Sequence, residues 1–268
     1  MVKGEHMKKL IIGMSSFLIL DLYFNVITHF VSNTIIQFVG LLLFFPLASS
    51  VGKLNGLQGL KGIGLVFHHN WRKHFAASFV MGFGVWLLMY SVYGWIGKFE
   101  IIGIQTGGEA WWALIQVMIG FFLGSFINDL ITRGFVINIL IGKLPPMFIG
   151  IISIFVYALD DFWNGDLTIL NFVFSLILGC SLTFSFYKSG SIWADTGIHF
   201  GLNVAYGLFY GLIGKAGGGL LLITEGAISP MLNTFILLSF ASLLFLPVFF
   251  YYGQSKPSML ANEKAEEI

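Results

Sequence analysis

One stretch of this 268-residue chain places opposite charges inside apolar sequence. In GSFINDLITRGFV, Asp129 and Arg133 lie four residues apart, and Asn128 adjoins Asp129. Side chains spaced by four share one face of a helix, so the acid and the base can form a charge-assisted pair that offsets part of their desolvation cost. The pattern is compatible either with a reactive centre or with an internal salt bridge that only fixes packing.

A second stretch, SGSIWADTGIHFGLNVAYG, carries a longer polar stripe. Asp195, His199 and Asn203 follow one another at intervals of four, and Tyr206 extends the same helix face at a spacing of three. A lone buried histidine is usually a packed core residue. An imidazole flanked by an acid and an amide is better explained as a site where protons are transferred.

Three further acids fall within or beside apolar runs. Asp160 and Asp161 close the run PMFIGIISIFVYAL, and Asp21 lies in an N-terminal run without an obvious local partner, which favours a helix-interface or near-surface role. Ionisable groups at bilayer depth are costly, so each needs a partner or a task. We expect Asp160 near the outer end of its span.

The elements that must position these residues are membrane helices. The chain is 57% hydrophobic and 10% charged with a mean hydropathy of +0.87, whereas soluble domains are roughly 45–50% apolar and about 25% charged. The net charge of +1 provides no basic field that would attract nucleic acid. The single cysteine, Cys180, excludes a disulfide within the chain and any cysteine-based metal site.

Apolar runs long enough to cross the hydrocarbon predict an all-α, polytopic membrane bundle of about eight helices, and residues 1–268 form one integral membrane domain. The predicted spans are Leu10 to Val31, Ile35 to Val51, Phe75 to Ile96, Trp111 to Ile141, Pro146 to Leu159, Leu167 to Tyr187, Ile192 to Ile213 and Met231 to Tyr252. Glycines spaced by four, such as the pairs Gly120 with Gly124 and Gly197 with Gly201, favour close packing of the fourth span against the seventh. Residues 253–268 are polar, and we expect a disordered tail there.

The basic residues predict that both termini are cytoplasmic. With that orientation eleven of them face the cytoplasm and only Lys98 and Lys215 face the other side, a strong positive-inside bias. The eleven are Lys3, Lys8, Lys9, Lys53, Lys61, Arg72, Lys73, Lys143, Lys188, Lys256 and Lys264. The segment from Lys53 to His74 mixes basic and apolar residues, as either an interfacial helix or an ordinary basic loop would.

The stretch GSIWADTGIHFGLN resembles the third motif of the CPBP family, the CAAX proteases and bacteriocin-processing enzymes also called the Abi family. His199 and Asn203 match the His and Asn of that motif. The first family motif, Glu-Glu-x-x-x-Arg-Gly, aligns with Asn128, Asp129, Arg133 and Gly134 but lacks the first Glu. The second, Phe-x-x-x-His, falls at Phe155, with Leu159 in place of the histidine and Asp160 next. The resemblance covers a core of about residues 111–213.

The resemblance implies an intramembrane endopeptidase whose chamber opens toward the cytoplasm. In that family the first Glu and the second-motif His activate a water, while the third-motif His and Asn stabilise the oxyanion. The substitutions at Asn128 and Leu159 remove the usual base, an effect of about 10²- to 10⁴-fold on rate. We expect Asp129, helped by Asp160 or Asp161, to replace it, with Asn128, Arg133 and Asp195 in supporting roles.

Three functions therefore remain open: a divergent CPBP-type endopeptidase acting on a membrane-associated peptide or protein, a catalytically impaired relative that binds a membrane partner in bacteriocin immunity or regulation, and a small transporter. A divalent metal, held if at all by His199 and Asp129, has weak support because no two-histidine spacing is present. The expected surroundings are the lipid bilayer, without nucleic acid, in a bacterial cell membrane.

Overall fold

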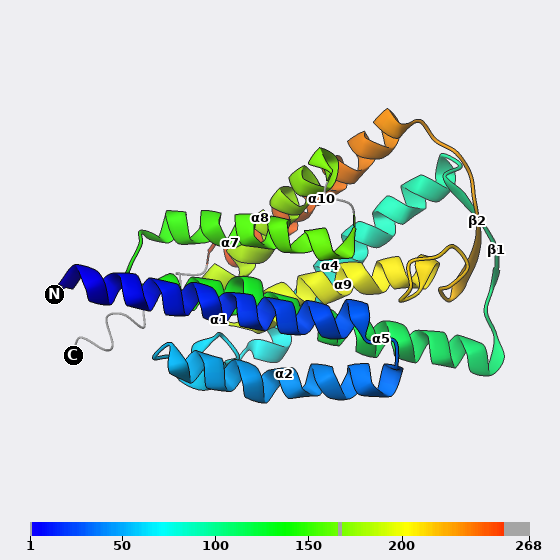
Figure 1. Cartoon of the computed structure of the whole chain (residues 1–268). Helices are drawn as coiled ribbons and strands as arrows, with labels where there is room; N and C mark the ends of the chain where they lie inside the picture. Colours follow the sequence, from blue (N-terminus) through cyan, green and yellow to red (C-terminus); the bar gives the residue numbers. More distant parts are fainter. Residues whose placement is uncertain (1, 166–167, 255–268) are drawn as a thin grey trace.

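The computed structural model describes residues 2–165 and 168–254, and within them the chain is a bundle of long helices with one small sheet (Figure 1). The elements are α1 Val2–Phe30, α2 Thr34–Leu54, α3 Gly59–Gly62, α4 Trp71–Trp95, β1 Phe99–Ile104, α5 Gly107–Asp129, the π-helical η1 Leu130–Phe135, α6 Val136–Leu140, α7 Pro146–Asp160, the 3-10 helix η2 Asp161–Asn164, α8 Ile169–Ser189, α9 Ile192–Tyr210, β2 Leu221–Glu225 and α10 Pro230–Tyr252. The predicted all-helical membrane bundle is confirmed. Nearly all of the tail predicted to be disordered lies outside the described residues.

Seven helical segments in the described part of the chain are long and apolar enough to cross a membrane. They correspond to all of the predicted spans except the one at Ile192–Tyr210. That helix forms as expected, but Asp195, His199 and Asn203 reduce its hydropathy, and most of its residues are buried among the other helices. Its polar stripe therefore faces protein.

The long segments alternate in direction, so the bundle has two distinct ends. The start of α1 and the end of α10 lie at one end, which we call the termini end, and the two strands lie at the other, which we call the hairpin end (Figure 1). The segment between α2 and α4 lies at the termini end and contains only the single helical turn α3. Of the two predicted alternatives, an interfacial helix and an ordinary basic loop, the structure has the loop.

The sheet at the hairpin end was not predicted. Strand β1 pairs antiparallel with β2, with Phe99 opposite Glu225. Lys98 precedes β1 and donates to the Asn233 side chain at 2.6 Å, which ties the sheet to α10. Burial lowers the pKa of Lys98 from its ordinary value, and the nearby Glu225 carboxylate partly opposes that shift.

Glycines allow α9 to lie directly against α4. A Cβ on Gly82 would stand 2.1 Å from the Ile198 carbonyl oxygen, and one on Gly201 would stand 2.4 Å from the Phe79 carbonyl oxygen. The predicted glycine pair at Gly197 and Gly201 thus packs on α4, not on α5. Helix α5 meets α9 further along, where Gly207 abuts Val117, so the fourth span still packs on the seventh and brings the two polar stretches together.

Candidate active site

A cavity of about 830 Å³ lies between α1, α4, α5, α7, α8 and α9, and we call it the chamber. Its apolar walls include several aromatic side chains, with Trp86, Tyr90 and Phe121 among them. Its polar lining includes Ser125, Asn128, Asp161, His199 and Asn203. An apolar cavity with a few convergent polar groups is the usual form of a ligand or active site.

His199 lines the chamber and contacts a buried acid through one of its ring nitrogens. Its Nδ1 lies 3.0 Å from Oδ1 of Asp129, and its side chain is 13% exposed whereas that of Asp129 is 0% exposed. When Nδ1 carries the hydrogen and donates a hydrogen bond to Asp129, Nε2 is left as a hydrogen-bond acceptor. Asp129 thereby selects the tautomer and orientation of His199.

Asp129 is shielded from a substrate or a water by its complete burial and by three side-chain contacts. Arg133 donates to Oδ1, the Thr196 hydroxyl donates to Oδ2 at 3.0 Å, and His199 contacts Oδ1 as well. Asp129 is not among the residues that line the chamber. These contacts satisfy the carboxylate in a completely buried position.

A layer of buried charge lies beneath the chamber, toward the termini end. Asp129, Thr132, Arg133, Asp195 and Thr196 are all completely buried, and we call these five residues the sealed layer. Asp195 occupies the first turn of α9, where the helix dipole favours an anion. Within the layer Arg133 pairs with Asp129, whereas both Asp195 oxygens and two of the Arg133 nitrogens have no hydrogen-bond partner among the described residues.

Two amides lie beside His199 on the chamber wall. The Asn203 side chain donates to the Ser125 hydroxyl at 3.0 Å, and the Asn128 side chain donates to the Asp160 carboxylate. Each amide nitrogen carries two hydrogens, so each retains a second one for a ligand. The side-chain oxygen of Asn128 is buried and accepts no hydrogen bond in the described structure.

The two aspartates of α7 and η2 occupy different environments. Asp160 is 7% exposed and does not face solvent. Asn25 of α1 donates to its Oδ1 at 3.3 Å, and the Asn128 side chain donates to its Oδ2. Asp161 lines the chamber and accepts from the Ser175 hydroxyl. Asp161 is therefore the acid that a bound molecule would meet.

The position aligned with the missing family histidine points away from the site. Leu159 is 57% exposed on the outside of the bundle, so it could not take part in chemistry in the chamber. The residue of α7 that does approach the site is Tyr157, whose ring lies 4.3 Å from the Arg133 guanidinium carbon and edge-on to His199. Sequence reasoning missed Tyr157, because a tyrosine in an apolar run gives no distinct signal.

Asp21 also has partners that the sequence could have indicated. Asn25 donates to its Oδ1 at 3.2 Å and also contacts Oδ1 of Asp160 at 3.3 Å, so one amide joins the two acids. A helical spacing of four already relates Asp21 to Asn25. Asp21 therefore has the helix-interface role, between α1 and α7.

The donor set around His199 does not fit a metal ion. Among the described residues, no group of three or more His, Cys, Asp or Glu side chains is close enough to hold one. The Asp129 oxygens are already occupied by Arg133, Thr196 and His199, which leaves a single imidazole nitrogen. A catalytic zinc needs about three protein ligands.

The chamber opens at the hairpin end. Exposed residues at its rim come from the ends of α1 and η2 and from the turn that follows α9, namely His29, Asn164, Leu212, Ile213 and Gly214. Asn128 and His199 lie deeper, above the sealed layer. A ligand therefore has an open route to His199 from the end opposite the termini.

Comparison with known proteins supports the family resemblance. Residues 110–205 match the family described as Type II CAAX prenyl endopeptidase Rce1-like, which confirms the similarity predicted from the motifs. The matched region runs from α5 through most of α9 and contains the chamber residues Ser125, Asn128, His199 and Asn203. No curated protein matches the chain. Within residues 110–205 the chain is thus similar to the CAAX protease-like family, and its long apolar helices are those of a multi-pass membrane protein.

Proposed function

We propose that the protein is an intramembrane peptidase in which His199, oriented by Asp129, is the general base. The observation that carries this proposal is the 3.0 Å contact between His199 Nδ1 and Asp129 at the boundary between the chamber and the sealed layer. An acid that fixes the tautomer of a histidine is the arrangement by which many hydrolases obtain a base near neutral pH. We place the protein in a bacterial cell membrane.

The reaction would use a water that donates a hydrogen bond to Nε2 of His199. His199 Nε2 removes that hydrogen as the water oxygen attacks a peptide carbonyl. The remaining amide hydrogens of Asn128 and Asn203 face the oxyanion, and the protonated His199 then returns its proton to the leaving amine. Asp129 is a positioning residue in this scheme, which revises its expected role as the base.

Purified protein in nanodiscs, incubated with a library of membrane-anchored peptides, tests the proposal. We expect cleavage that falls about 10²- to 10⁴-fold in His199→Ala and substantially in Asp129→Asn. His29→Ala is the matched control, because His29 lines the same chamber at its exposed rim. Cleavage unchanged in His199→Ala would refute the proposal.

A second candidate is a relative that binds a membrane partner without cleaving it. The observation that favours it is Asn128, which puts an amide in the chamber where the family motif has a carboxylate. The variant Asn128→Glu distinguishes the peptidase from the binding relative. If the wild-type protein is inactive and the variant cleaves, the wild-type protein is an impaired relative. If the wild-type protein cleaves and Asn128→Glu does not accelerate it, the His199 mechanism stands. A transport path is disfavoured because the five residues of the sealed layer are completely buried.

A further inference from the structure

The positions of two independent sets of residues indicate which side of the membrane the chamber opens to. The first is the set of basic residues: in the described part of the chain nine belong to the termini end and two, Lys98 and Lys215, belong to the hairpin end. The second is the set of chamber-lining residues, whose exposed members all lie at the hairpin end. Because basic loops remain in the cytoplasm, the rim of the chamber is placed on the opposite side of the membrane.

We propose that the chamber takes its substrate from the non-cytoplasmic side of the membrane, as a peptide segment that carries basic residues beside an apolar stretch. The substrate class rests on the peptidase function proposed above, whereas the side of access does not. The direction is opposite to the cytoplasmic opening that the family resemblance implies. The two expectations from the sequence, cytoplasmic termini and a cytoplasmic chamber, cannot hold together in this fold.

The apolar part of the proposed substrate follows from the walls. Phe24, Trp86, Phe121 and Phe174 surround the polar floor of the chamber, so a ligand of matching chemistry buries apolar side chains there and brings one backbone carbonyl to His199. Such walls favour a ligand through apolar burial, at about 25 cal/mol per Å². A segment already associated with the bilayer can supply this surface.

The basic part follows from the charges at the hairpin end. Asp161 lines the chamber, and Glu100, Glu109 and Glu225 are exposed at the same end. Of the two basic residues there, Lys98 is held by the Asn233 side chain. Acidic groups near a cavity with low-dielectric walls raise the local concentration of cations, and the effect weakens with salt.

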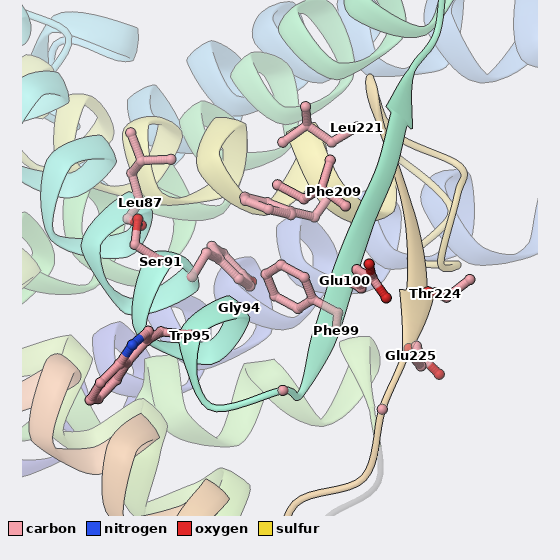
Figure 2. A pocket seen from close by; sticks show the side chains of 14 residues that line it. Leu87, Ser91, Gly94, Trp95, Phe99, Glu100, Phe209, Leu221, Thr224 and Glu225 are labelled. Carbon is pink, nitrogen blue, oxygen red and sulfur yellow. The ribbon is translucent and has the colours of Figure 1, made fainter.

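A neighbouring pocket extends the acidic surface beyond the chamber. Figure 2 shows this pocket, of about 720 Å³, between α4 and the two strands, where Glu100 and Glu225 come from adjacent strands. Tyr90 lines both the pocket and the chamber. Phe99 and Phe209 lie in the pocket with their ring centroids 5.1 Å apart. A peptide that extends past the chamber would meet an apolar floor with two carboxylates beside it.

Thiol labelling tests the side of access without any need for cleavage. In a Cys180→Ala background we would introduce Asn164→Cys at the rim, Asn203→Cys inside the chamber, and Lys143→Cys at the termini end as the matched control. A membrane-impermeant trimethylammonium methanethiosulfonate should modify the first two in intact cells, and the third only in inside-out vesicles. Gly214→Cys replaces any rim variant that fails to accumulate. The reverse pattern, or modification of Asn203→Cys only from the cytoplasmic side, would overturn the proposal.

The same variants test the charge preference. Relative to a free thiol, Asn203→Cys should react several-fold faster with the trimethylammonium reagent than with a sulfonate reagent of similar size. High salt and Asp161→Asn should both reduce that ratio. A ratio equal to that of the free thiol would overturn the basic character of the substrate. Correct labelling with an inactive protein would instead refute only the peptidase function.

Discussion

Helices α5 and α9 build two neighbouring regions from nearly adjacent residues, and the regions are physically opposite. In the chamber, Ser125, Asn128, His199 and Asn203 face a cavity and keep unused hydrogen-bonding capacity. In the sealed layer, Asp129, Thr132, Arg133, Asp195 and Thr196 are completely buried. A polar residue within a membrane span is therefore not by itself a reactive group. Here the charged side chains are buried behind the site, and the uncharged polar side chains face the cavity where a ligand would bind.

The largest expected effect breaks the sealed layer. Arg133→Met leaves Asp129 buried without its cation, and removal of one partner of a buried ion pair typically costs about 3–5 kcal/mol. We expect little folded protein, measured as monodisperse material and as the thermal-unfolding midpoint in detergent. The double variant with Asp129→Asn should recover part of that loss. A single variant as stable as the wild-type protein would show that the pair does not hold the layer together.

A smaller effect is expected where α4 lies against α9. Gly82→Ala forces a Cβ onto the Ile198 carbonyl oxygen and should lower stability by about 1–3 kcal/mol, as overpacking does. Gly84→Ala is the control on the same helix, since its Cβ would meet nothing within 4 Å. Equal unfolding midpoints for the two variants would contradict the close helix contact.

Thr196→Val removes one hydrogen bond from the sealed layer while it keeps the shape of the side chain. The buried Oδ2 of Asp129 loses its donor, which should cost about 1–3 kcal/mol, and Thr196→Ser should retain most of the stability. The difference between the thermal-unfolding midpoints of the two variants in detergent measures this loss of stability. A valine variant as stable as the serine variant would mean that Oδ2 needs no donor.

The smallest effect should appear in the chamber. Ser125→Ala removes the partner of the Asn203 amide, at a typical cost of about 0.5–1.5 kcal/mol. We expect a several-fold lower kcat with a nearly unchanged unfolding midpoint, because the chamber does not hold the fold. A loss of stability without a change in kcat would reverse the distinction between the two regions.

Much of the fold and part of the site could be predicted from the sequence. Hydropathy gave the helices, and the spacing of Asp195, His199 and Asn203 gave their shared face, because both depend on local helical geometry. The sequence did not distinguish Asn128, which faces the chamber, from Asp129, which does not. That distinction depends on how α5 is rotated against α9, which is set by packing across the bundle.

Long-range contacts account for the rest. The burial of Asp160 depends on Asn25, which is 135 residues away along the chain. The alignment of the second motif put weight on Leu159, which lies on the outer surface of α7. The side on which the chamber opens depends on where several helix ends meet, and no single stretch of sequence contains that information.

The π-helical turn at Leu130–Phe135 has a consequence for insertions and deletions in this chain. A π turn accommodates one residue more than an α turn in the same helix. Deleting one residue there would restore regular α-helical geometry and leave the later side chains of α6 on nearly the same faces, whereas a deletion in the α-helical part of α5 would rotate them by about 100°. Gly134 would have to be kept, because a Cβ there would stand 2.3 Å from the Ile63 carbonyl oxygen. Within this bundle, the π turn is therefore the place where the loss of one residue disturbs the later helix least.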